Sequence, residues 1–341
     1  MANLTRAHHE LFQRSPDERF SSLREICEHS QQEMQFSNDC WHLPMSLQPR
    51  AADGSVTVTL GDDGAFLLND WSFTQLCQLS GVSKKTVNRL SPETASRALQ
   101  ETVPGADKPV QFLTTGRSVR SLHGVTYTRL WNADLLDVVR EFATDFQPPQ
   151  SGAGGATGLY CGEQDMFVFL IDPTGWAEIN GEAFAPGFFL WNSEVGRRSL
   201  GIQSFWFQAI CQNHIVWDAV EVVDFTRKHT ANVHEGLGEI RRIIEALVAR
   251  RDDRRDGFVR VLTKAMQETL GADAESVAKE LARNGIPRNL AQDAIEIARQ
   301  QGAFTIFALV DALTRLTQKA KYAGDRVEAD AKVASLLALA V

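Results

Sequence analysis

The sequence contains one stretch in which two long apolar runs enclose a polar turn, and it reads GFFLWNSEVGRRSLGIQSFWFQAICQNHIVW from Gly187 to Trp217. The apolar runs are long enough for two buried strands, or for one strand and a helix. The turn between them carries a carboxylate and two guanidinium groups, those of Glu194, Arg197 and Arg198. A short polar segment between buried runs is where we expect either a binding site or a well-capped turn.

The composition of the chain is that of an ordinary globular protein. Of its 341 residues, 43% are hydrophobic and 23% are charged, which excludes disorder of the whole chain. No window approaches the roughly 18 apolar residues of a membrane span, and the N-terminus lacks the apolar core of a secretory signal. The five cysteines are odd in number and scattered, as is typical of reduced thiols. We therefore expect a cytoplasmic protein with no membrane partner.

The charge is distributed unevenly along the chain. Its net value is −8, but residues 1–225 contain 16 Lys and Arg against 27 Asp and Glu, whereas residues 226–341 contain 19 against 16. A surface that is basic all over is therefore excluded. Any polyanionic partner would have to meet a local basic patch.

Hairpins and helices alternate in the N-terminal two thirds of the chain. A capped helix is predicted from Pro16 to about Glu33, because Ser15 precedes a proline and an acidic turn. Alternating apolar residues around Gly-rich or polar turns predict two β-hairpins. These hairpins are Val56–Leu60 with Ala65–Leu68, and Thr157–Cys161 with Met166–Ile171.

Two Cys-x-His pairs lie near the N-terminus, Cys27 with His29 and Cys40 with His42. A zinc site needs ligands that converge tetrahedrally, and residues two apart on a helix point away from each other. Buried or incidental cysteines explain these pairs better than zinc does. We therefore predict no metal and no cofactor.

The segment from Thr74 to Arg89 is typical of a helix-turn-helix. Gly81 would make the turn, and a second helix from Ser83 to Leu90 would present Lys84 and Lys85 to a DNA groove. The alternative is a purely structural helical hairpin, because this unit lies between two β-hairpins instead of beside a third helix.

Alternation returns from Pro109 to Leu130 and predicts a three-stranded antiparallel meander. Arg117, Arg120 and Arg129 lie on it and are three of the few basic residues in the acidic part of the chain. An amphipathic helix from Ala133 to Phe146 follows, capped by Trp131-Asn132.

From Phe225 onward the pattern is helical. Leu237, Ile240, Ile244 and Leu247 repeat at intervals of three and four, which indicates a helix with an apolar seam. The last helices, 305–321 and 328–340, are rich in apolar residues and form either core or an oligomer interface. We predict an α+β fold, with an antiparallel sheet and packed helices in residues 1–225 and a mainly helical region in residues 226–341, and a homo-oligomer formed through the C-terminal helices.

Two blocks of the sequence resemble one known family. The segment VRSLHGVTYTRLWNADLL from Val119 to Leu136, and the central block around the polar turn, are similar to the domain of unknown function 932 family, the phage/plasmid-like proteins. The resemblance extends from about Phe20 to about Ala334. The residues of the central block are Asn192, Ser193, Glu194, Gly196, Cys211 and Asn213. The family has no defined activity, so the resemblance implies a setting, mobile genetic elements, but no mechanism.

An enzymatic function is one alternative. Cys211, Asn213 and His214 include the parts of a Cys-His-Asn arrangement. The sequence has no Gly-rich phosphate loop, no paired-carboxylate metal signature and no His-Glu-x-x-His motif. We therefore assign no catalytic residue.

The function that we predict is sequence-tolerant binding of single-stranded DNA, in which arginines on strands contact phosphates and aromatic rings stack on bases. The predicted binding residues are Arg117, Arg120, Tyr127, Arg129, Arg197, Arg198, Lys84 and Lys85. Further aromatic candidates, which would alternatively belong to the core, are Trp131, Trp191, Phe205 and Trp206. The remaining alternatives are a protein-interaction module without nucleic acid and a duplex binder that uses the helix-turn-helix.

Overall fold

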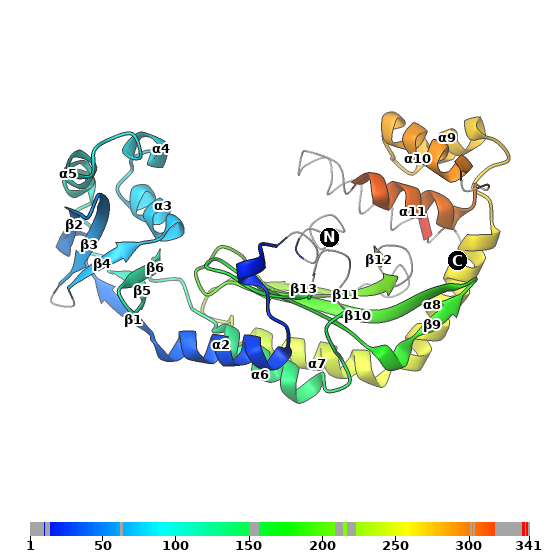
Figure 1. The fold of residues 1–341 in the computed structure, drawn as a ribbon, viewed down its shortest axis with the longest axis horizontal. Coiled ribbons are helices and arrows are strands. Elements are labelled where there is room, and N and C mark those ends of the chain that lie inside the picture. Colours follow the sequence, from blue (N-terminus) through cyan, green and yellow to red (C-terminus); the bar gives the residue numbers. More distant parts are fainter. Residues whose placement is uncertain are drawn as a thin grey trace.

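Two β-sheets and several helices make up the protein in a computed structural model, which confirms the predicted α+β class. The structure describes residues 10, 14–61, 64–149, 157–208, 214–216, 223–300, 302, 304–317, 336–337 and 339. Figure 1 shows a small sheet with its helices at one end, a long central sheet in the middle, and a helical group at the other end.

The N-terminal sheet has the strand order β1-β5-β6-β4-β3-β2. Its strands are β1 (Ser37–His42), β2 (Leu47–Ala52), β3 (Ser55–Leu60), β4 (Ala65–Leu68), β5 (Val110–Thr115) and β6 (Ser118–His123). All neighbours are antiparallel except β4 and β6. The hairpin predicted at residues 56–68 is confirmed as β3 and β4.

The predicted three-stranded meander is wrong in its last strand. Strands β5 and β6 form the first two, but residues 125–130 form no strand. The Tyr127 amide instead donates a hydrogen bond to the Gly124 carbonyl, which closes a turn. The side chains of Tyr127 and Arg129 bond to the turn that follows β10, so this segment connects the two sheets.

Three helices accompany the N-terminal sheet, α3 (Asp70–Leu79), α4 (Lys84–Val87) and α5 (Pro92–Thr102). Each begins at a side-chain cap, supplied by Asn69, Ser83 or Ser91. The predicted second helix of a helix-turn-helix, 83–90, is therefore wrong in length, because α4 is a single turn of four residues. Its Val87 is buried in the core of this sheet.

Helix α2 (Leu23–Gln35) begins later than the predicted start at Pro16. Pro16–Glu18 forms a separate 3₁₀ turn, η1. The cap is Ser22, whose side chain accepts a hydrogen bond from the Glu25 amide at 3.2 Å. The Glu25 carboxylate in turn accepts the Ser21 amide at 2.8 Å.

The two apolar runs on either side of the polar turn lie in two long antiparallel strands, β10 and β11, so the two-strand interpretation holds for the described residues. Leu190 pairs with Ile202, and Trp191 pairs with Gly201. A Cβ atom at Gly201 would lie 2.1 Å from the Trp191 ring, so glycine is required there. The strands of the central sheet are β7 (Leu159–Cys161), β8 (Met166–Ile171), β9 (Ala177–Ile179), β10 (Glu182–Asn192), β11 (Leu200–Gln208), β12 (His214–Val216) and β13 (Asp224–Arg227). The hairpin predicted at 157–171 is confirmed as β7 and β8.

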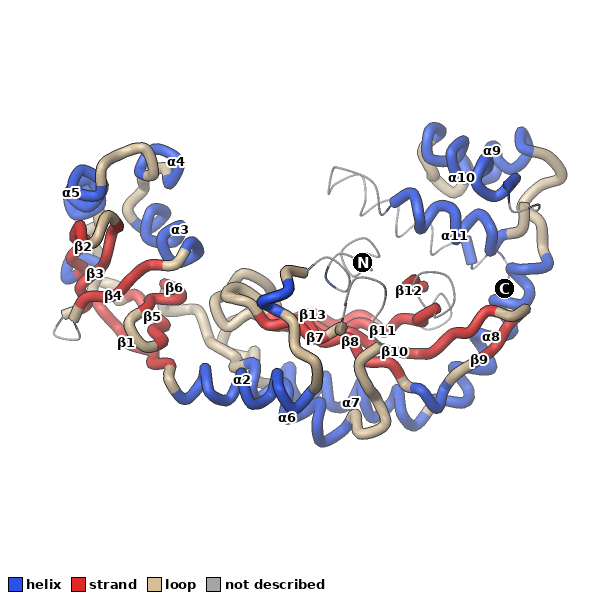
Figure 2. The backbone as a smooth tube through the Cα atoms, in the orientation of Figure 1, coloured by secondary structure: helices blue, strands red, loops and turns tan. Residues whose placement is uncertain are grey.

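Helices cover one face of the central sheet (Figure 2), namely α2, α6 (Asn132–Phe142) and α7 (Glu235–Ala249). Alternate strand residues such as Val168, Leu190 and Ile202 pack against them. The residues between these, which point to the opposite face, include the buried aromatic rings of Phe169 and Phe189.

The C-terminal helices are α8 (Arg251–Gln267), α9 (Ala274–Arg283), α10 (Arg288–Gln300) and α11 (Ile306–Thr317). Their apolar residues share a core with the start of β10 and the end of β11, which lie away from the polar turn. There Trp206 stacks on Phe258 at 3.9 Å between ring centroids. The described part of this apolar region is therefore core. The helix predicted at 328–340 lies largely outside the described residues.

The boundary predicted at residue 225 falls inside β13, which pairs with β11. Helix α7 also packs on the central sheet. Residues on both sides of that boundary thus contribute to one packed unit. Among the residues that the structure describes, no helix has both the length and the apolar character needed to cross a membrane.

Removing the Phe258 ring tests the contact between the central sheet and the C-terminal helices. Phe258 is buried against Trp206 and Phe184, so Phe258→Ala is expected to lower the free energy of unfolding by about 3–5 kcal/mol. Phe36→Ala is the matched control, because that ring is 68% exposed. Urea denaturation measures both. Equal losses would contradict the packing described here.

Candidate functional site

The central block lies where the N-terminal sheet, α6 and the central sheet meet. Its residues Asn192, Ser193 and Glu194 are buried although they are polar. The Ser193 hydroxyl donates to the Gln164 carbonyl at 2.5 Å and accepts the Arg197 amide at 2.9 Å. These bonds hold the turn between β10 and β11 in one conformation.

Glu194 joins three parts of the chain through its carboxylate. One oxygen accepts the backbone amide of Asn132, the first residue of α6, at 2.8 Å. This position at a helix N-terminus favours a negative charge. The other oxygen lies 3.0 Å from Nη1 of Arg120, which itself lies 3.4 Å from the Glu33 carboxylate. Desolvation raises the pKa of the Glu194 carboxyl, and Arg120 and the Asn132 amide oppose that rise.

The backbone carbonyl of Glu194 is also fully bonded. It accepts a hydrogen bond from the Tyr127 hydroxyl at 2.9 Å and another from Nη1 of Arg129. Arg129 pairs in addition with Asp39 of β1, Nη2 to Oδ1 at 2.7 Å. The segment between β6 and α6 is therefore tied both to the turn and to the edge of the N-terminal sheet.

Two further residues of the central block have structural roles. The Asn192 side chain donates to the Leu130 carbonyl and to the Asn132 side chain, both at 2.9 Å. Gly196 has a positive φ of 70°, and a Cβ atom there would lie 2.6 Å from the His123 ring. Only glycine combines this backbone conformation with so close a neighbour.

His123 and His229 both lie near the ring of Tyr127. The Tyr127 ring stacks on His123 at 3.6 Å and lies 5.5 Å from His229 between centroids. Burial lowers the pKa of His123 to about 3 and that of His229 to about 4, and the positive charge of Arg129 acts in the same direction. Both imidazoles are therefore neutral near pH 7.

A polar pocket of about 760 Å³ opens between the N-terminal sheet, α2 and the turns of the central sheet. Basic and acidic side chains line it together. Arg14 and Arg198 both bind Asp165, Arg14 at 2.8 Å, and Arg198 also binds Glu10 at 2.9 Å. The lining residues that bear on its chemistry are Glu18, His29, Glu33, Arg120, Cys161 and Arg197.

The predicted nucleic-acid-binding residues divide into two groups. Arg120, Arg129, Arg198 and Lys84 pair with carboxylates, and the Tyr127 hydroxyl bonds to a carbonyl. Within the described ranges, no ion pair involves the exposed Arg117, Arg197 or Lys85. Arg120 and Arg129 of the first group thus hold together the junction, the place where the N-terminal sheet, α6 and the turn after β10 meet. The second group presents cations to solvent that no described carboxylate neutralises.

The other predicted residues have more limited roles. Trp191, Phe205 and Trp206 are buried in the core, as the alternative interpretation of these aromatics stated. Trp131 is half-buried beside Arg129. Cys211 and Asn213 lie outside the described residues, and only the backbone of His214 is described, as the start of β12.

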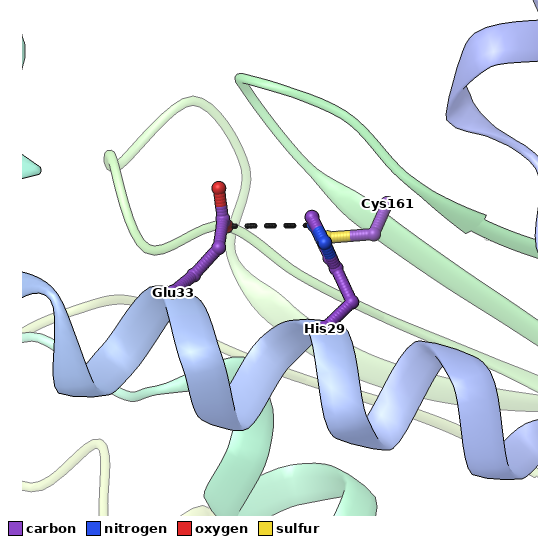
Figure 3. Close-up of side chains that lie close together, drawn as sticks. All are labelled: His29, Glu33 and Cys161. Atoms are coloured by element: carbon purple, nitrogen blue, oxygen red, sulfur yellow. Dashed lines mark ion pairs between the residues drawn. The ribbon is translucent and has the colours of Figure 1, made fainter.

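Sequence reasoning missed one grouping, formed by His29, Glu33 and Cys161 (Figure 3). His29 and Glu33 lie one turn apart on α2, and Cys161 ends β7. Cys27 points instead into the core with Ile26. This agrees with the prediction that Cys27 and His29, two residues apart on a helix, point away from each other. A His-x-x-x-Glu spacing is visible in the sequence, but the third member comes from a distant hairpin, and no local pattern reveals it.

Breaking the junction by Arg120→Met is expected to leave the buried Glu194 carboxylate without its guanidinium. The free energy of unfolding at pH 7 should fall by about 3–5 kcal/mol. The double variant Arg120→Met/Glu194→Gln should recover much of this loss, because no unpaired charge then remains buried. Arg24→Met, which breaks the exposed pair with Glu28, is the control and should change stability little. A double variant less stable than the single one would refute this account.

The two buried imidazoles make a pH dependence measurable. Each folded-state pKa is lower than the unfolded value of 6.5, so the stability that they contribute is complete above pH 6.5 and is lost as the pH falls toward 4 and 3. The loss approaches about 1.4 kcal/mol per pH unit for each histidine. Denaturation curves from pH 7.5 to 5 should be less pH-dependent for His123→Phe than for the wild type. Identical slopes for His123→Phe and the wild type would contradict the prediction.

Comparison of the chain with known proteins gave no match. The chain matches no family model, no curated protein and no solved structure. Its function must therefore be inferred from the contacts, burial and charge of its own residues.

Proposed function

We propose that the protein is a non-enzymatic nucleic-acid-binding protein that holds single-stranded DNA at the rim of the polar pocket without reading its sequence. The observation that carries this proposal is the position of two exposed arginines on turns of different sheets. Arg117 belongs to the turn between β5 and β6, whose Thr115 and Ser118 line the pocket. Arg197 lines the same pocket from the turn between β10 and β11.

These two arginines suit phosphate binding because no carboxylate among the described residues neutralises them. Guanidinium groups bind phosphate oxygens with two parallel hydrogen bonds. The pocket itself contains both signs of charge, so it would not attract a polyanion strongly. Binding would therefore use few phosphate contacts at the rim and would be modest in strength.

Aromatic rings accompany both arginines. The Phe36 carbonyl accepts the Gly116 amide, which places the exposed Phe36 next to the turn of Arg117. The Arg197 guanidinium lies 5.3 Å from the ring centroid of the half-buried Trp71. Stacking of bases on aromatic rings contributes to binding of any sequence, because every base has a flat face.

The family resemblance supports the same class of function, since it implies a setting in mobile genetic elements. It remains a prediction from the two motif blocks. The homo-oligomer, predicted from the apolar C-terminal helices, and the cytoplasmic location, predicted from the scattered cysteines and the N-terminus, remain predictions as well. A duplex-reading helix-turn-helix has less support, because α4 has one turn and its Lys84 pairs with Asp70 at 2.5 Å.

Fluorescence anisotropy of a labelled oligothymidine strand, titrated with the protein at several salt concentrations, tests the proposal. Each phosphate contact on a single strand contributes about 0.7 to the slope of log affinity against log salt. Arg117→Ala/Arg197→Ala should therefore reduce that slope by about 1.4 and weaken binding at low salt. Arg288→Ala/Arg299→Ala removes two exposed arginines of α10 and should leave the slope unchanged.

Three results would count against this function. These are no binding of a single strand by the wild type at low salt, preference of the wild type for the corresponding duplex, and equal losses of affinity in the rim and α10 variants. In the last case the binding would follow total charge and would not depend on the rim. Circular dichroism of each variant shows whether it is folded before the comparison is made.

A further inference from the structure

The three side chains in Figure 3 offer different ligand atoms to one point in space. The imidazole of His29, the carboxylate of Glu33 and the thiol of Cys161 place one such atom each within 4.8 Å of the others. Nε2 of His29 lies 3.8 Å from Oε2 of Glu33. The ligand atoms around a tetrahedral ion at about 2.0–2.3 Å are roughly 3.3–3.8 Å apart, so a small adjustment of side chains would bring them to coordination distance.

Rigid elements carry all three groups. Helix α2 places His29 and Glu33 on the same face, because residues four apart lie one above the other. The backbone of β7 fixes Cys161 through its pairing with Met166 of β8. The ring of Phe20 packs against His29 at 5.0 Å between centroids and limits its orientation. A site built on a helix and a strand needs less ordering on binding than one built on loops.

One side chain near Cys161 contacts its sulfur. The Asn132 amide donates toward its sulfur at 3.7 Å, the kind of outer contact that orients a metal ligand. Glu33 and Glu194 both lie close to Nη1 of Arg120, at 3.4 and 3.0 Å. Burial and the neighbouring carboxylates of Glu194 and Glu33 raise the pKa of the Cys161 thiol, so a metal ion would have to displace its proton on binding.

The donor set identifies the class of metal. Nitrogen from histidine, sulfur from cysteine and oxygen from a carboxylate are the ligands of zinc, whereas magnesium and calcium prefer oxygen alone. The three residues also line the polar pocket, so the fourth position of a tetrahedral ion would be accessible to water or to an anionic group of a ligand.

We propose that His29, Glu33 and Cys161 form a binding site for one zinc-type divalent cation, with a fourth coordination position open to the pocket. This site is independent of DNA binding at the rim, since it uses none of the rim arginines. A bound cation would fix the distance between α2 and β7 and would stabilise the folded chain.

Titration of the metal-free full-length protein with Co²⁺, followed by competition with Zn²⁺, tests the proposal. Cobalt bound to a thiolate gives an intense charge-transfer absorption in the near ultraviolet, and tetrahedral coordination gives visible bands. One equivalent of Co²⁺ should produce both, and one equivalent of Zn²⁺ should remove them. Zinc should also raise the melting temperature of the wild type.

Three variants and one control separate this site from nonspecific binding. Cys161→Ala should abolish the thiolate absorption. His29→Gln and Glu33→Gln, which change half-exposed side chains, should each weaken Zn²⁺ binding by at least about tenfold and test the site even if Cys161→Ala does not fold. Cys40→Ala, which changes a half-buried cysteine on β1, should bind like the wild type. Absence of the thiolate band in the wild type, or wild-type affinity in both His29→Gln and Glu33→Gln, would overturn the proposal.

Discussion

The buried ion pair between Glu194 and Arg120 is the interaction on which the rest of the structure depends. Removing both charges from water is unfavourable, and their attraction offsets this only when every remaining polar atom finds a partner. Two such partners are the Asn132 amide, which bonds to the carboxylate, and Glu33, which lies beside the guanidinium. The pair therefore requires α2, β6, the turn after β10 and the start of α6 to be in place together.

This requirement explains why the polar residues of the central block are buried. Their side chains replace the hydrogen bonds that water would otherwise supply to the ends of β10 and α6. Arg120, Arg129 and Arg198, which looked available for a ligand in the sequence, are paired for the same reason, because a buried guanidinium needs a carboxylate. What remains for ligands is the exposed rim of the pocket, together with the three metal-ligand side chains on its wall.

The sequence predicted most of the regular elements for identifiable reasons. Alternation around Gly-rich or polar turns predicted the β3–β4 and β7–β8 hairpins, and periodic apolar residues predicted α6, α7 and α11. The errors arose where tertiary contacts override local preference. Residues 125–130 alternate like a strand, but Tyr127 and Arg129 bond to the turn after β10. Ser15 and Ser22 both resemble helix caps, but the Ser15 side chain caps no amide. The Ser22 side chain accepts the Glu25 amide, and the Glu25 carboxylate accepts the Ser21 amide.

By itself, the sequence determined the α+β class, the polar turn between two long apolar strands and the residues that gather there, because periodicity and turn chemistry act over a few neighbouring residues. Only the tertiary structure decided what those residues do. Whether an arginine meets a carboxylate or solvent, as with Arg120 and Arg197, depends on segments far apart in the chain. The same is true of His29, Glu33 and Cys161, which come together only when α2 packs beside β7. Local patterns do not record such contacts, because the folding of the whole chain brings them about.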